Sequence, residues 1–207
     1  MKRLLRIIKK LVGQIRTWIF CQRSGIPFDS TWQIGGGRIL VKKTPWYVCY
    51  FNHLKPGNLR IGKKFRCANG PNYNSIGTIQ SCLFNISKPN SCIEIGDNVG
   101  ISGSTLNASK LIKIGNNVLI GSGCLITDTD SHPINWEDRL IDDVEKIKSA
   151  PIIIEDNVFI GARSIILKGV TIGKCSVIAA GSVVTHSIPA NVVAGGNPAK
   201  IIKKLID

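Results

Sequence analysis

Residues 154–184 read IEDNVFIGARSIILKGVTIGKCSVIAAGSVV, and an aliphatic side chain occupies every sixth position of this stretch. The series consists of Ile154, Ile160, Ile166, Ile172, Ile178 and Val184. A strand repeats every two residues and a helical stripe every three or four, so neither produces this spacing. An unbroken period of six is typical of a parallel β-helix, in which each hexad forms one short strand.

The positions around each aliphatic residue are patterned too. Small or β-branched residues stand four places after it, at Val158, Ser164, Val170, Ser176, Ser182 and Ile188. An inward aliphatic side chain and a small residue near each corner would let the chain bend round a triangular coil, so three hexads should complete one turn. The repeat continues upstream with slips, first at Ile95 and Ile101 and then, displaced by one residue, at Ile114, Ile120 and Ile126.

The repeat is interrupted between Ile126 and Ile154, which are 28 residues apart. That gap equals four hexads plus four residues, so the extended loop 127–151 is not regular repeat. The loop is polar and carries Asp128, Asp130 and His132 near its start. Functional residues often lie on a polar excursion from a regular solenoid, and we expect a site here.

The positive charge of the chain is concentrated in its N-terminal third. The 207 residues carry a net charge of +14. Residues 1–66 hold 15 Lys or Arg and one acid, Asp29, whereas residues 67–207 hold 12 of each sign. This segregation predicts a polyanionic partner for the first third alone, which may be sought among anionic lipids, anionic glycans and phosphorylated substrates. No nucleic-acid motif accompanies the basic region, so nucleic-acid binding is not predicted.

Residues 1–22 predict a basic amphipathic helix. Apolar residues recur every three or four positions, and the first twenty residues carry a charge of +6 without an acid. No apolar run approaches the ~20 residues that span a bilayer. Two interpretations stay open: residues 1–20 lie on an anionic membrane surface, or the helix caps the open end of the solenoid or packs on a neighbouring subunit.

Residues 23–92 predict irregular N-terminal coils, with turns at the glycine run 35–37 and strands over 39–41 and 46–51. Residues 93–207 predict the regular β-helix with a short C-terminal extension. None of the seven cysteines forms a C-x-x-C pair, so we interpret them as small buried residues of a reducing, cytoplasmic compartment.

Over residues 93–204 the chain resembles the hexapeptide-repeat acyltransferases, and within them the galactoside, maltose and surface-polysaccharide O-acetyltransferases. The resemblance rests on a set of motifs in a fixed order: IEDNVFIGA at 154–162, GVTIG at 169–173, AGSVVT at 180–185, IPA at 188–190 and GNPAK at 196–200. It implies an all-β fold, a left-handed parallel β-helix, assembled as a homotrimer. It also implies acetyl-CoA as the acyl donor, bound in the cleft between neighbouring coils.

In the family that the chain resembles, a histidine before a proline is the general base, and Ser131-His132-Pro133 matches that motif. A base with a pKa near neutrality suits this step, because a hydroxyl is a poor nucleophile until its proton is removed. Asp130 or Asp128 is a candidate to orient the His132 ring, or else a turn cap. Where the sugar acetyltransferases have an asparagine, this chain offers Ser102 and Ser104 as candidate donors.

The resemblance also implies residues that hold the coenzyme. Small residues would let its pantetheine arm approach the backbone, an aromatic residue would lie at the acceptor pocket, and lysines would pair with its phosphates. The matching positions are Phe159, Gly161, Ala162, Ala180, Thr185, His186, Lys200 and Lys203. No histidine has the spacing of a metal ligand, so no catalytic metal is predicted.

The sequence therefore predicts acetyl-CoA-dependent O-acetylation of a sugar hydroxyl, in a bacterial surface glycan or its precursor. The basic helix would hold such an enzyme peripherally at the inner membrane face. An amine acceptor on an amino-sugar, a serine hydroxyl, and a non-catalytic scaffold remain open as alternatives.

Overall fold

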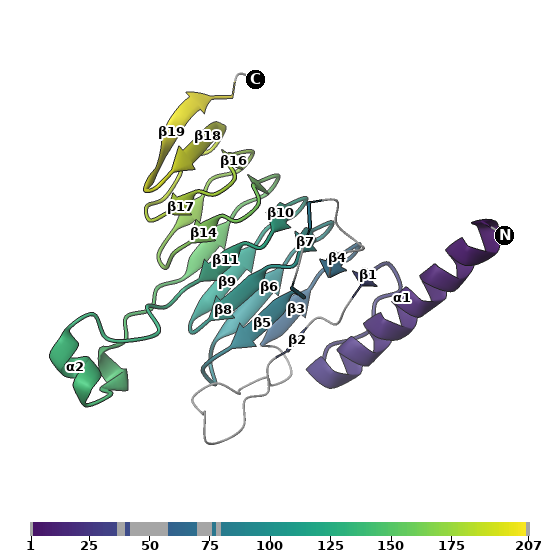
Figure 1. Ribbon diagram of the computed structural model, residues 1–207, viewed down its shortest axis with the longest axis horizontal. Coiled ribbons are helices and arrows are strands. Elements are labelled where there is room, and N and C mark those ends of the chain that lie inside the picture. Colours follow the sequence, from purple (N-terminus) through teal and green to yellow (C-terminus); the bar gives the residue numbers. More distant parts are fainter. Residues whose placement is uncertain (1, 37–39, 42–57, 70–75, 78–79, 206–207) are drawn as a thin grey trace.

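The computed structural model describes residues 2–36, 40–41, 58–69, 76–77 and 80–205, and these form a three-sided prism of short strands with a helix at one end (Figure 1). The predicted N-terminal helix is present as α1 (Lys2–Ser24), which packs against the first strand. All strand pairs are parallel except the last, so the chain winds in one direction from coil to coil.

Three sheets form the sides of the prism. Sheet A contains, in spatial order, β1 (Gln33–Gly36), β4 (Arg66–Asn69), β7 (Gly100–Ser102), β10 (Leu119–Ser122), β13 (Phe159–Ile160), β16 (Val177–Ile178), β18 (Val192–Gly196) and β19 (Ala199–Lys204). Sheet B contains β2 (Leu40–Val41), β5 (Leu83–Ile86), β8 (Thr105–Ala108), β11 (Leu125–Thr127), β14 (Ile165–Ile166) and β17 (Val183–Val184). Sheet C contains β3 (Leu59–Ile61), β6 (Cys92–Ile95), β9 (Leu111–Ile114), β12 (Ile152–Ile154) and β15 (Thr171–Ile172).

The aliphatic residues of the six-residue repeat point into the prism. Each of the six from Ile154 to Val184 is at most 1% exposed, and so are the small residues Ser164, Ser176 and Ser182. Ile154 pairs with Ile172, one turn of 18 residues later, which confirms that three hexads make a turn. The core is thus a set of stacked columns, in which each aliphatic side chain contacts its equivalents in the coils above and below.

Stacked asparagines shape the corner between sheets C and A. Asn98, Asn117 and Asn157 have φ angles of 56°, 57° and 60°, a left-handed conformation that asparagine tolerates better than most residues. The Asn98 amide donates to Asn117 Oδ1 over 2.9 Å, and the Asn117 amide to Asn157 Oδ1 over 3.1 Å. The side chains that permit the turn therefore also join one coil to the next.

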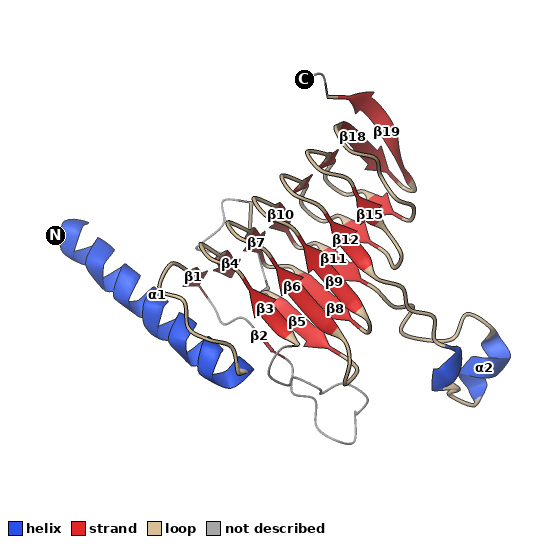
Figure 2. Ribbon diagram, turned by 180° about the vertical axis from the view of Figure 1, so that it is seen from behind, coloured by secondary structure: helices blue, strands red, loops and turns tan. Residues whose placement is uncertain are grey.

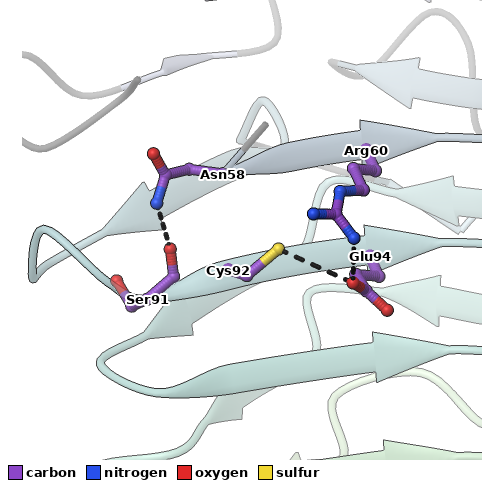
Figure 3. Close-up of polar contacts among 5 residues, drawn as sticks. All are labelled: Asn58, Arg60, Ser91, Cys92 and Glu94. Carbon is purple, nitrogen blue, oxygen red and sulfur yellow. Dashed lines mark hydrogen bonds and ion pairs between the residues drawn. The ribbon is translucent and has the colours of Figure 1, made fainter. Parts of the chain in front are cut away.

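The N-terminal coils are more regular than the sequence suggests. Leu59, Arg60 and Ile61 of β3 pair in register with Ile93, Glu94 and Ile95 of β6. Outward polar side chains join these two strands, since Arg60 Nη1 lies 2.8 Å from Glu94 Oε1 (Figure 3). The turns predicted at residues 35–37 are wrong at Gly35 and Gly36, which belong to β1, whereas residues 46–51 lie outside the described residues.

We expect Gly96→Ala to destabilise the fold, because a Cβ at this corner would lie 2.6 Å from the carbonyl oxygen of Gly115 in the next coil. Overpacking of this kind costs about 1–3 kcal/mol of the free energy of unfolding, measurable by urea denaturation. Gly181→Ala is the comparison, since its Cβ would meet no atom within 4 Å and only the φ of 72° is unfavourable. Equal losses for the two variants would contradict a steric origin.

Candidate active site

The extended loop leaves sheet B after β11 and returns at β12 through a short antiparallel stem. Thr129 pairs with Ser149, the Asp130 N–H donates to the Lys148 carbonyl over 3.0 Å, and the Ala150 N–H donates to the Asp128 carbonyl over 2.9 Å. Because Ile126 and Ile154 occupy successive strands of one coil, 22 of the 28 residues between them are an insertion. Beyond the stem, α2 (Trp136–Leu140) and the 3₁₀ turn η3 (Val144–Lys146) project away from the prism (Figures 1 and 2).

His132 lies at the exit of this stem, with its side chain exposed. The preceding residue, Ser131, has a φ of 64°, and its N–H donates to Thr129 Oγ1 over 3.1 Å. The following residue, Pro133, is buried, and its carbonyl accepts a hydrogen bond from Arg139 Nη1 over 3.0 Å. The backbone on both sides of His132 is therefore held while its ring faces solvent.

The two carboxylates near His132 have different surroundings. Asp128 is fully buried and accepts the backbone N–H groups of Ser109, Lys110 and Leu111 over 2.6–2.8 Å, so it caps the corner of the preceding coil. Burial raises the pKa of Asp128, and the three N–H donors oppose that shift. Both of its oxygens are occupied, which makes Asp128 a structural residue.

Asp130 keeps one oxygen for another partner. Its Oδ1 lies 2.6 Å from Lys168 Nζ, which comes from the equivalent corner of the next coil. Its Oδ2 is buried, and no hydrogen-bond partner for it occurs among the described residues. Of the two predicted candidates for orienting His132, only Asp130 has an acceptor to offer.

Ser102 and Ser104 also differ. The Ser104 hydroxyl is buried, donates to the carbonyl groups of Ser102 and Gly121 over 2.9 Å, and accepts the Cys124 N–H. These bonds make Ser104 part of the coil wall, and it is not available as a donor to a substrate. Ser102 is partly exposed on the outer side of sheet A and remains the candidate.

The predicted coenzyme residues gather at the corner between sheets A and B. A Cβ on Gly161 would lie 2.5 Å from the Ala180 backbone nitrogen, so close stacking of the coils by itself requires glycine there. Ala162 is partly exposed and Ala180 exposed, which leaves a strip of accessible backbone beside small side chains. Phe159, 45% exposed, stands on sheet A two residues before this corner.

Other predicted residues lie elsewhere. Thr185 Oγ1 contacts His186 Nδ1 over 2.8 Å at the corner between sheets B and C, the corner from which the extended loop also leaves. About 16 Å of extended chain separates Ala180 from Thr185. Lys200 and Lys203 are exposed on β19, at the C-terminal end of sheet A. Within one chain, the His132 stem and the Ala162 strip therefore occupy opposite edges of sheet B.

A groove that the sequence did not reveal runs across the outer face of sheet A. Its volume is about 450 Å3, and it extends from β1 to β13. The groove is lined by Gln33, Arg66, Cys67, Ala68, Gly100, Ile101, Ser102, Leu119, Ile120, Gly121 and Phe159. Gln33 and Arg66 escaped sequence analysis because the steps from Ile34 to Cys67 and to Ile101 along this sheet are 33 and 34 residues, which hides the six-residue period.

Comparison with known proteins agrees with a fold built from hexapeptide coils. The family model described as the hexapeptide repeat of succinyl-transferase matches residues 151–186. A hexapeptide-repeat-containing acetyltransferase from Vibrio cholerae superimposes with a TM-score of 0.53 at 30% identity, over 72% of each chain. A galactoside acetyltransferase in complex with coenzyme A superimposes with a TM-score of 0.55 at 35% identity, over 70% of this chain and 67% of that one.

The chain belongs to the hexapeptide-repeat acetyltransferase family, and the predicted left-handed parallel β-helix is confirmed. Among curated relatives, a Saccharomyces cerevisiae protein named only provisionally as an acetyltransferase is 46% identical over 118 residues, 56% of this chain and 57% of that protein. A Staphylococcus aureus 2,3,4,5-tetrahydropyridine-2,6-dicarboxylate N-acetyltransferase is 39% identical over 90 residues, 44% of this chain and 32% of that protein. The chain thus spans between about a third and three fifths of the curated relatives it matches.

The different roles of the two aspartates are testable by stability. Asp128→Ala leaves three buried N–H groups without an acceptor, so we expect a loss of about 3 kcal/mol in the free energy of unfolding. Asp130→Ala removes an ion pair that is partly open to solvent, and we expect a loss below about 1 kcal/mol. Urea denaturation of both variants measures the difference. A larger loss for Asp130→Ala would reverse the assignment.

Proposed function

We propose that this protein transfers the acetyl group of acetyl-CoA to a hydroxyl group of a sugar, with His132 as general base. The observation that carries the proposal is the exposed His132 ring on a backbone held by the stem and by Arg139. The 35% identity to a galactoside acetyltransferase that binds coenzyme A supports the choice of donor and acceptor class.

The mechanism that we propose begins when His132 accepts the proton of the acceptor hydroxyl. The hydroxyl oxygen then attacks the thioester carbonyl, and the tetrahedral intermediate collapses with the thiol of coenzyme A as leaving group, to which the imidazolium returns the proton. The unpaired Asp130 Oδ2 would hold the ring N–H of His132, while Lys168 keeps Asp130 in place. Ser102 is the candidate donor to the oxyanion.

The small side chains of Ala162 and Ala180 fit the acyl donor, because a pantetheine arm hydrogen-bonds to backbone groups. Thr185 and His186 would continue this contact, and Lys200 and Lys203 would pair with the phosphates of the coenzyme. Phe159 would face the acceptor, whose sugar ring would enter the groove of sheet A over the small residues Gly100 and Gly121.

We propose a homotrimer, because the two halves of this site lie on opposite edges of sheet B in one chain. A neighbouring copy would bring its His132 to the Ala162 strip. The tip of the extended loop supports this arrangement: Ile134, Trp136, Leu140 and Ile141 are all exposed there, and α2 buries no residue. Large apolar side chains gathered in this way mark an interaction surface.

The acceptor that we favour is a bacterial surface glycan or its precursor, met by an enzyme at the inner face of the membrane. An amine acceptor is the second candidate, favoured by the 39% identity to an N-acetyltransferase over 90 residues. A serine hydroxyl and a non-catalytic scaffold are the remaining alternatives, and the variant described next separates the scaffold from both enzymes.

We expect His132→Ala to lower kcat about a hundredfold or more, the usual contribution of a general base, with the KM for acetyl-CoA little changed. The release of coenzyme A thiol measures both constants, with sugars, amino-sugars and serine each offered as acceptor. His53→Ala is the control, because neither motif nor geometry assigns that histidine to the site. Full activity in His132→Ala would refute the base, and a preference for amino-sugars would select the second candidate.

The assembly makes a separate prediction. The double variant Trp136→Glu with Leu140→Glu should convert a trimer into monomers by light scattering, since it introduces charge into the apolar tip without touching a buried residue. The monomers should keep their far-UV circular dichroism and lose acetyl transfer. A wild-type chain that is already monomeric and active would rule out the shared site.

A further inference from the structure

Helix α1 carries an apolar face that no part of the described chain covers. Its exposed large hydrophobic residues are Leu4, Ile7, Ile8, Leu11, Val12, Ile15, Trp18 and Ile19. At 100° per residue these positions fall within an arc of about 140°. Leu11, Ile15 and Trp18 in its centre are 53%, 57% and 52% exposed. Such a patch on one helix requires an explanation.

The rest of the helix is already used. Thr17, Phe20 and Cys21 are buried, and Gly13 brings the helix backbone close to β1, where a Cβ would lie 3.6 Å from the Ile34 carbonyl oxygen. The cap that the sequence allowed is therefore real, and it is made by one side of the helix. Because this side is anchored on β1, the apolar face is turned outward from the end of the prism (Figure 2).

Charge decides what can cover this face. Residues 1–28 contain seven Lys or Arg and no Asp or Glu, while residues 67–207 are neutral. A second copy of α1 would bring like charges together, and the neutral β-helix of a neighbour offers no compensating excess of acid. A bilayer with anionic lipids accommodates both features, since its interface takes the apolar face and its headgroups attract the cations.

We propose that α1 is an interfacial helix that docks the N-terminal end of the prism on an anionic lipid bilayer. No helix in the described part of the chain has both the length and the apolar character to cross a membrane, which agrees with a helix that lies in the surface. The docking deepens the proposed location at the membrane, and it does not depend on the acetyl transfer.

Docking in this orientation has a consequence for the acceptor. The groove of sheet A begins at β1, the strand that α1 covers, and Gln33 and Arg66 line that end of it. A glycan attached to a lipid in the same bilayer would therefore enter the groove from its membrane end and lie with its reacting sugar toward Phe159. In a trimer whose prisms run side by side, three α1 helices would share one plane and strengthen the binding by avidity.

Sedimentation with vesicles tests the docking on the full chain. We expect the protein to pellet with phosphatidylcholine vesicles that contain 30% phosphatidylglycerol at least tenfold more than with pure phosphatidylcholine, and 0.5 M NaCl should reduce the bound fraction. Leu11→Glu with Ile15→Glu should lower binding to the anionic vesicles at least tenfold. The matched control is Leu140→Glu with Ile141→Glu, which places two charges on an equally exposed apolar site away from α1 and should bind normally.

Trp18 supplies a readout inside the helix. Its fluorescence should shift to the blue on addition of anionic vesicles, and Trp18→Phe should remove most of that shift. The docking is overturned if the α1 double variant pellets as the wild type does, or if both vesicle types bind equally. A change in oligomeric state with unchanged vesicle binding would overturn it too, by assigning the face to a protein interface. Acetyl transfer to a soluble sugar should persist in the α1 variant, so a failed docking leaves the catalytic proposal standing.

Discussion

The stacking of successive coils at the spacing of hydrogen-bonded strands is the constraint on which this molecule depends. Parallel strands lie about 4.8 Å apart, so every inward position must hold a side chain that fits its equivalents one turn above and below. Ile154 and Ile172 illustrate the result, since they pair in register and are both buried. At the corners the same spacing brings backbones so close that only glycine fits at positions such as 96, 115 and 161. Aliphatic residues inside and minimal residues at the corners are two consequences of one distance.

Because the repeat satisfies itself, chemistry has to come from departures from it. The extended loop is the largest, and its stem is tied to the prism from both sides: Asp128 caps the coil before it, and Lys168 reaches Asp130 from the coil after it. The outer face of sheet A is a second departure. Sheet C fills its surface with pairs such as Arg60 and Glu94, whereas sheet A presents glycine and serine and is hollowed into a groove. Both features are precise because they are attached to a rigid column.

The asymmetry of charge has a related origin. A β-helix of neutral surface can stack beside its own copies, and the excess of cations is kept on the N-terminal third, next to the one helix whose apolar side faces away from the core. The chain thereby separates two tasks that conflict, since a cationic apolar surface on the prism itself would oppose close assembly. The single helix performs both the capping of the core and the presentation of this surface, on opposite sides.

The sequence alone determined the β-helix, the three-hexad turn, the place of the interruption and the amphipathic helix, because each follows from local spacing that a linear pattern records. It also located His132 through a motif. Only the tertiary structure decided that Asp128 is structural while Asp130 keeps a free oxygen, that Ser104 is buried, and that Arg66 and Phe159 share a groove. Those roles depend on which residue stands one turn away, and insertions of varying length set that distance along the chain without any trace in the period.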